Sequence, residues 1–257
     1  MEDILRINRV SKWFGGLEAL HEVDLNLRKG QIFALIGPNG SGKTTLLNII
    51  NGIYTPTRGS IEFLGEPMIG LAPHDITRKG IGRTFQTIRL FPEMSVKQNV
   101  MVGRHCRTRA SVFSVIFRTD SMKKEEEGIE KRASEEIRFL GLSDQTSNTA
   151  KNLPYGDQRL LELARALATD PTLLLLDEPA AGMNEAETKT LIEYIGKIRN
   201  RGITILLVEH DMNLVMAISD QIAVLNFGKK IAEGDKETIQ NNQKVIEAYL
   251  GKGMTYA

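Results

Sequence analysis

The sequence predicts an α/β fold with a mostly parallel sheet, because three strand-sized runs are apolar on both faces. These runs are Ile32–Ile36, Thr172–Leu176 and Ile203–Val208. Strands without a polar face belong in the interior of a parallel sheet that helices cover on both sides. A helical segment, Thr45–Ile50, follows the first run, and an apolar stripe at helical spacing, Leu191–Ile198, follows the second. Strands that alternate with helices in this way are typical of a parallel sheet.

The composition limits the class of protein. With 257 residues, 41% of them hydrophobic, the chain can form one large domain or two small ones with a substantial core. Its 33 Lys and Arg residues are balanced by 32 Asp and Glu residues, which argues against a dedicated nucleic-acid binder. The single cysteine, Cys106, permits no disulfide within the chain and fits a reducing compartment. Because we see no signal-peptide pattern and no apolar run of about 18 residues, we expect a chain that is soluble when isolated.

The first part of the chain predicts further strands around the first buried run. Ile4–Val10 and Leu17–Leu27 alternate apolar and polar residues, which predicts antiparallel strands separated by the turn at Phe14-Gly15-Gly16. Ser60–Leu64 predicts another strand, and Ile81–Gln86 predicts a strand that leads into a loop. Phe14 either packs in its hairpin or offers a flat ring to a nucleotide base, and the residues leave both interpretations open.

Residues 87 to about 155 predict a helical insertion between the halves of the α/β core. Within it, Lys123–Leu140 carries an apolar stripe on a charged helix, and an apolar cluster at 112–117 is expected to pack beneath the insertion. Leu153–Gln158 opens the next helix, with Pro154 expected in its first turn.

The C-terminal half predicts a capped helix, a hairpin and two short helices. Asn184 is expected to cap the helix that carries the Leu191–Ile198 stripe. Ile222–Phe227 and Lys229–Glu233 predict a hairpin through Gly228, and short helices are expected near 236–241 and 243–250.

A glycine-rich loop joins the first buried run to its helix. Its residues match G-x-x-x-x-G-K-T and are Gly37, Pro38, Asn39, Gly40, Ser41, Gly42, Lys43 and Thr44, followed by Thr45. Glycines let the backbone turn tightly and bring N–H groups close to phosphate oxygens, and the helix adds its positive end. Lys43 can reach the β and γ phosphates of a nucleotide, and the Thr44 hydroxyl can ligate Mg²⁺. The flanking strand and helix are the context that makes this phosphate-loop motif specific.

Acidic residues end the other two buried runs, at the edge where open α/β sheets bind ligands. Asp177 is placed to hold Mg²⁺ through the metal's water shell, and Glu178 can act as general base toward an attacking water. His210 ends the third run and could contact a γ-phosphate, although a lone histidine is more often a structural group. Phosphoryl transfer to water needs positioning and charge neutralisation. The loop and the acids together predict an ATP hydrolase.

These motifs, over the full length of the chain, resemble the nucleotide-binding subunits of ATP-binding-cassette transporters. Gly37–Thr44 is similar to the Walker A loop, and Leu173–Asp177 to Walker B, followed by the catalytic Glu178. The resemblance implies that Gln86 is the Q-loop residue that senses Mg²⁺, that His210 is the switch histidine, and that Phe14 stacks on adenine. It places the signature segment at Leu153, Pro154, Tyr155, Gly156 and Asp157 and a D-loop residue at Asn184.

The resemblance also implies an architecture and an assembly. The expected fold is a P-loop NTPase core with a RecA-like, mostly parallel sheet, an N-terminal antiparallel β subdomain and an inserted helical signature subdomain. Residues 1–86 and 160–257 are expected to form the core, and 87–159 the helical part. Family members pair head to tail, so that each ATP lies between one phosphate loop and the signature of the other copy. Two features depart from the family pattern: Pro154 and Asp157 replace the signature serine and glutamine, and Asn184 replaces the D-loop aspartate.

A narrower resemblance is to the larger ATPase of branched-chain amino-acid importers. It is carried by Gly82–Phe91, Glu178–Gly182, Val208–Met212 and Val245–Gly251. It implies ATP and Mg²⁺ as ligands, a second ATPase subunit, two membrane permease subunits and an external solute-binding protein, with the chain at the cytoplasmic face of the membrane. Urea and amide importers use similar subunits and remain an alternative. A cassette ATPase that acts on DNA or ribosomes and a nucleotide-gated assembly module that is not an enzyme are the rival functions.

Overall fold

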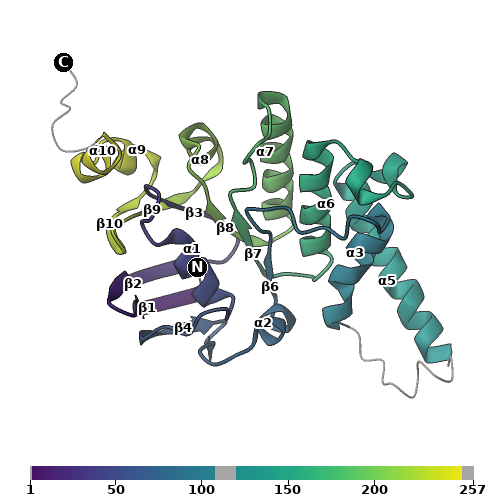
Figure 1. Ribbon diagram of the computed structural model, residues 1–257, viewed down its shortest axis with the longest axis horizontal. Helices are drawn as coiled ribbons and strands as arrows, with labels where there is room; N and C mark the ends of the chain where they lie inside the picture. Colours follow the sequence, from purple (N-terminus) through teal and green to yellow (C-terminus); the bar gives the residue numbers. More distant parts are fainter. Residues whose placement is uncertain (1, 108–119, 251–257) are drawn as a thin grey trace.

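The computed structural model describes residues 2–107 and 120–250, which form two sheets with helices packed around them (Figure 1). The larger sheet has six strands in the order β10-β9-β3-β8-β7-β6, and only β10 runs antiparallel to its neighbour. Its strands are β3 (Ile32–Ile36), β6 (Ile81–Arg83), β7 (Leu173–Asp177), β8 (Thr204–Val208), β9 (Gln221–Asn226) and β10 (Lys229–Gly234). All residues of β3, β7 and β8 are buried, which confirms the three apolar runs as central parallel strands.

The smaller sheet is antiparallel and has the order β2-β1-β4-β5. Its strands are β1 (Asp3–Phe14), β2 (Leu17–Arg28), β4 (Arg58–Phe63) and β5 (Glu66–Pro67). The first strand continues to Phe14, four residues beyond the expected Val10, because irregular pairing lets it follow β2 to the turn. The antiparallel β part of the predicted fold class is therefore confirmed.

Alternate residues of β3 supply two different cores. Phe33 and Leu35 pack against the small sheet and α1 (Lys43–Ile50), so α1 lies between the two sheets. Ile32 faces the other side, in the core formed with α6 (Tyr155–Leu167) and α7 (Glu185–Asn200). A third core joins the sheet to α8 (Met212–Ile218), α9 (Lys236–Gln240) and α10 (Gln243–Leu250). Helices on both faces complete the predicted α/β class.

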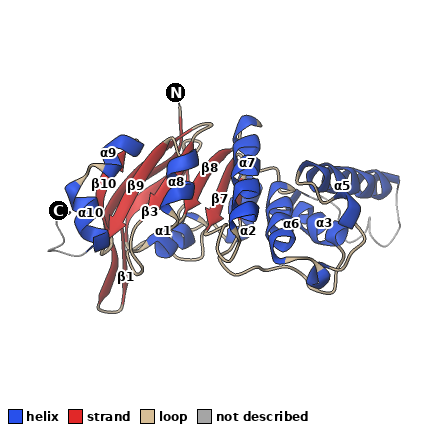
Figure 2. Cartoon of the chain, turned by 90° about the horizontal axis from the view of Figure 1, so that it is seen from above, coloured by secondary structure: helices blue, strands red, loops and turns tan. Residues whose placement is uncertain are grey.

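The predicted insertion contains helices that pack beside α6 at one end of the molecule, away from the small sheet (Figure 2). They are α3 (Val96–Arg104) and α5 (Asp120–Phe139), with 3₁₀ turns at His105–Arg107, Ser143–Gln145 and Ala150–Asn152. Ala133, Ile137 and Leu140 of the expected stripe are buried. Both oxygens of the buried Glu136 accept hydrogen bonds of 2.7 Å from Arg201, which follows α7, so α5 is tied to the core. The apolar cluster at 112–117 lies outside the described residues.

Three local features differ from the sequence prediction. Pro154 is the N-cap of α6 and does not lie in its first turn, since the helix begins at Tyr155. The helices α2 (Pro73–Lys79) and α8 have seven residues each, too few for the apolar spacing that revealed the longer helices.

Within 2–107 and 120–250, no helix combines the length and the apolar character needed to cross a membrane.

Candidate active site

The glycine-rich loop leaves β3 and enters α1, as its motif requires. Gly37, Gly40 and Gly42 have φ of 148°, 78° and 106°, a region that residues with a side chain rarely occupy. A Cβ on Gly37 would lie 2.1 Å from the Leu225 carbonyl oxygen, and one on Gly42 would lie 2.8 Å from the Ala19 carbonyl oxygen. The loop therefore depends on glycine both for its backbone conformation and for its close contact with β9 and β2.

Lys43 lies inside this loop. Its Nζ donates hydrogen bonds to the carbonyl oxygens of Gly37 (2.6 Å) and Pro38 (3.1 Å). Burial lowers the pKa of Lys43, and the charges of Glu178 and Asp177 oppose that shift. The neighbouring Thr44 is exposed. The loop thus brings a cation close to both predicted acids while the Thr44 hydroxyl remains accessible to a ligand.

Asp177 is the last residue of β7 and forms a buried ion pair. The Arg83 guanidinium donates to Asp177 Oδ2 (2.9 Å) and to Asn48 Oδ1 on α1 (2.8 Å), and both members of the ion pair are 5% exposed. Burial raises the pKa of the Asp177 carboxyl, whereas the hydrogen bond and charge of Arg83 lower it. The sequence analysis did not identify Arg83, whose partner is 94 residues away along the chain.

Three predicted residues from different strand ends meet at one carboxylate oxygen. Gln86 Nε2 donates to Glu178 Oε2 (2.9 Å), and His210 Nδ1 lies 3.6 Å from the same oxygen. Glu178 itself has φ of 48°, so its side chain leaves the end of β7 from a left-handed turn. The His210 side chain is 60% exposed and Glu178 is 17% exposed, which keeps the cluster open to a ligand.

A cavity of about 580 Å³ is lined by the glycine-rich loop and by Gln86 and Glu178 of this cluster, whereas His210 does not line it. Residues 39–45 and Phe14 line this cavity as well. Phe14 is 41% exposed, and its ring meets that of Tyr54, in the loop after α1, edge to face at 5.1 Å, so it packs against this loop and also lines the cavity. Phe227 lines the same cavity and is 86% exposed. Sequence reasoning missed Phe227, although an aromatic residue before a hairpin glycine was the available signal.

Glu209 is a third residue whose role sequence reasoning missed, after Arg83 and Phe227. Its buried carboxylate accepts hydrogen bonds from the backbone N–H groups of Ala180 (3.0 Å) and His210 (3.1 Å). Burial raises the pKa of this carboxyl, and the two N–H groups oppose that shift. Glu209 thereby holds the loop after Glu178 beside His210.

The expected signature segment lies at a separate place on the chain. Pro154, Gly156 and Asp157 line a hollow of about 230 Å³ beside the start of α7, away from the cavity that Lys43 lines. A Cβ on Gly156 would lie 2.6 Å from Glu187 Oε1, so a side chain there would require the Glu187 side chain to move. Asp157 Oδ2 accepts a hydrogen bond from Gln145 Nε2 (2.7 Å) and so is oriented toward the insertion.

The remaining predicted residues of the signature segment and D-loop are Leu153, Tyr155 and Asn184, and Leu153 is buried. Tyr155 Oη donates to the Ala181 carbonyl oxygen, 2.8 Å away. The Asn184 side chain accepts from the N–H groups of Ala186 and Glu187, as expected of an N-cap. Within one chain, therefore, the signature segment does not meet the cavity.

Comparison with known proteins places the chain in a family. Residues 20–181 match the family model described as ABC transporter, and residues 229–254 match the one described as branched-chain amino acid ATP-binding cassette transporter. The chain is 46% identical to the high-affinity branched-chain amino acid transport ATP-binding protein LivG of Salmonella typhimurium, covering 98% of this chain and 99% of that protein. It is 43% identical to BraF of Pseudomonas aeruginosa, which carries the same description, with 97% and 98% covered.

Solved structures support the same assignment. The ADP conformation of MJ1267, an ATP-binding cassette of an ABC transporter, has a TM-score of 0.86 and 34% identity, with 98% of this chain and 100% of that chain covered. The dimeric structure of MJ0796, a bacterial ABC transporter cassette, has a TM-score of 0.76 and 26% identity over 90% and 98%. With matched motifs, fold and sequence over nearly its whole length, the chain belongs to the ATP-binding cassette family of ABC transporters.

Proposed function

We propose that this chain hydrolyses ATP to drive an importer of branched-chain amino acids. The observation that carries this proposal is the single cavity that joins the Lys43 loop to the Glu178 carboxylate. The loop N–H groups and Lys43 bind the β and γ phosphates. Glu178 accepts a proton from water as the water oxygen bonds to the γ-phosphorus and the bond to the β–γ bridging oxygen breaks. ADP and phosphate are the products.

The donor set near the loop fits Mg²⁺, a hard cation that prefers oxygen ligands. Thr44 offers an exposed hydroxyl, Asp177 a carboxylate oxygen and Gln86 an amide oxygen. When bound, Mg²⁺ would supply positive charge that offsets the negative charge of the triphosphate. Arg83 holds one oxygen of Asp177 and so fixes the direction of that carboxylate.

We infer that the active unit is a pair of cassettes. The signature segment lies away from the cavity of its own chain, so its helix N-terminus is available to a nucleotide held by another cassette. Pro154 takes the N-cap position, which leaves the first-turn N–H groups of α6 to make this contact. The second cassette is either another copy of this chain or a sister subunit.

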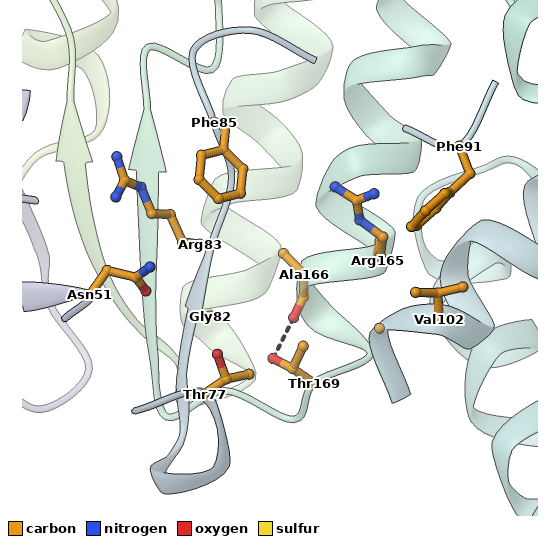
Figure 3. A pocket seen from close by; sticks show the side chains of 11 residues that line it. Asn51, Thr77, Gly82, Arg83, Phe85, Phe91, Val102, Arg165, Ala166 and Thr169 are labelled. Carbon is orange, nitrogen blue, oxygen red and sulfur yellow. Dashed lines mark hydrogen bonds between the residues drawn. The ribbon is translucent and has the colours of Figure 1, made fainter. Parts of the chain in front are cut away.

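A second cavity offers a docking place for a permease subunit, so a pair of cassettes would dock two of them. Such docking would hold the chain at the cytoplasmic face of the membrane. This cavity has a volume of about 280 Å³ and lies between β6, α3 and α6. Figure 3 shows Arg165 between the rings of Phe85 and Phe91, and the Phe91 ring is 44% exposed. Because Phe85 immediately precedes Gln86, a permease segment bound here would act directly on the loop that contacts Glu178.

Branched-chain amino acids are the proposed solute because both named relatives carry that description and the C-terminal family model does too. An external solute-binding protein would deliver them to the permease. The Gly82–Phe91 and Val208–Met212 segments, on which the resemblance was based, lie at the site that couples ATP to the permease.

The test is transport by the complete complex in proteoliposomes. We expect leucine uptake that requires ATP, with hydrolysis stimulated by the permease. The same preparation should take up no urea. Urea uptake without leucine uptake would replace the proposed solute by the alternative. Hydrolysis stimulated by DNA or ribosomes and indifferent to permease would contradict the importer function.

A further inference from the structure

A buried arginine on α6 contacts two loops that meet at Glu178. The Arg159 side chain is 4% exposed. Its guanidinium donates to the carbonyl oxygens of Phe85 (3.1 Å) and Gln86 (2.8 Å), and to that of Ala181 (3.2 Å). The first two oxygens belong to the loop after β6, and the third belongs to the loop after Glu178. One side chain therefore fixes the backbone on both sides of the general base.

Tyr155, one helical turn earlier, completes this arrangement. Its hydroxyl donates to the Ala181 carbonyl oxygen (2.8 Å) and accepts from Arg159 (2.9 Å). The Arg159 guanidinium carbon also lies 5.4 Å from the centre of the Tyr155 ring. A Cβ on Gly182 would lie 3.0 Å from this ring, so the loop after Glu178 packs closely against it.

The contacts form a continuous path from the helix to the general base. Arg159 holds the Gln86 carbonyl group, and the Gln86 side chain donates to Glu178 Oε2 (2.9 Å). On the other side, Tyr155 and Arg159 hold Ala181, and the Ala181 N–H donates to the Glu178 carbonyl oxygen (3.1 Å). Neither Tyr155 nor Arg159 lines the cavity that contains Lys43.

We propose that Tyr155 and Arg159 are positioning residues that tie the start of α6 to Gln86 and Ala181 and so set the Glu178 carboxylate for hydrolysis. This inference rests on the proposed ATPase function and adds to it. The same first turn of α6 is offered to the nucleotide of the second cassette. Movement of α6 on closure of the pair therefore reaches Glu178 of its own chain through Arg159.

Two variants of the full-length chain test this role. Tyr155→Phe removes the hydroxyl and keeps the ring, and Arg159→Gln removes the charge and most of the donors. We expect kcat for ATP hydrolysis to fall about fivefold in Tyr155→Phe and at least about tenfold in Arg159→Gln, the ranges for losing a neutral and a charged hydrogen bond. Because neither residue touches the phosphate loop, the Kd for ATP should change less than about twofold. Tyr194→Phe, which removes a hydroxyl elsewhere, is the matched control and should leave kcat unchanged.

A double-mutant cycle distinguishes positioning from general stability. If Arg159 acts partly through Gln86, then Arg159→Gln should lose part of its effect on kcat in a Gln86→Ala background. Thermal denaturation identifies any variant that fails to fold, and Tyr155→Phe keeps the test valid if Arg159→Gln does not fold. An unchanged kcat in Tyr155→Phe, or a loss in Arg159→Gln that is fully additive with Gln86→Ala, would overturn the inference. Absence of ATPase activity in the unmodified chain would instead refute the proposed function.

Discussion

Glu178 is the proposed general base, and its backbone is held in an unfavourable conformation. Its φ of 48° costs a non-glycine residue about 1–3 kcal/mol, a cost that surrounding contacts must offset. The Glu178 N–H donates to the Val208 carbonyl oxygen (2.8 Å), and its side chain accepts from Gln86. The left-handed turn directs the carboxylate toward the cavity at the point where the buried strand ends.

Phe227 is expected to contact bound nucleotide, because it lines the cavity beside the phosphate loop and is 86% exposed. Gly228, the next residue, donates to the Ser41 carbonyl oxygen (3.0 Å), which fixes the turn against that loop. Phe227→Ala should raise the Kd for ATP about two- to tenfold, the range for losing one aromatic contact. Fluorescence of Trp13, the single tryptophan, provides the titration signal. Phe91→Ala is the control and should not change Kd; an equal effect of both variants would contradict the assignment.

Sequence predicted the residues whose motifs are local, and it missed those that act across the fold. The phosphate loop could be identified because spacing alone places Lys43 and Thr44 between a strand and a helix. Gln86, Glu178 and His210 could be named but not shown to meet. Arg83 and Arg159 could not be found, because the contact of Arg83 with Asp177 spans 94 residues and those of Arg159 with Phe85 and Gln86 span 74 and 73.

At the scale of elements, Asn184 departs from the aspartate of the family pattern and still caps the N-terminus of α7. The Asn184 side chain accepts from the N–H groups of Ala186 and Glu187, and the Glu187 carboxylate accepts from the Asn184 N–H, which forms a capping box. The cap fixes the start of α7 beside Gly156, so it also supports the signature segment.

Replacing Asn184 tests whether the residue acts as a cap. Asn184→Ala should lower the free energy of unfolding by about 1 kcal/mol, since two N–H groups lose their acceptor. Asn184→Asp restores the aspartate of the family pattern, keeps an acceptor and should be within about 0.5 kcal/mol of the unmodified chain. Urea denaturation gives both values. Equal stability of the alanine variant and the unmodified chain would show that the cap does not contribute.

Element boundaries were predictable where apolar periodicity was long, and less so elsewhere. The central strands and α7 were predicted from their patterns of apolar residues, and the C-terminal hairpin was predicted from the glycine at its turn. The helices α2 and α8 are too short to show a period. The position of Pro154 depended on where the α6 backbone becomes helical, which a proline permits at either of two neighbouring positions.

On the scale of the whole molecule, packing around the six-stranded sheet places α1 and the phosphate loop where this sheet meets the small antiparallel sheet. The helix α1 lies between the sheets, and the phosphate loop that precedes it contacts β2 and β9. The insertion packs through α6 on the other face and carries the signature segment away from the cavity. Under the proposed function, one chain would offer half of each of two nucleotide sites, which is the reason for proposing a paired assembly.

The central claim is that Glu178 hydrolyses ATP held by the Lys43 loop between paired cassettes. It is tested most directly by mixing Glu178→Gln with radiolabelled ATP and Mg²⁺ and separating species by size. We expect this variant to elute as a cassette pair that retains uncleaved ATP. Lys43→Ala, which loses the phosphate contact, should elute without nucleotide. ADP formation by Glu178→Gln at the rate of the unmodified chain would contradict the account.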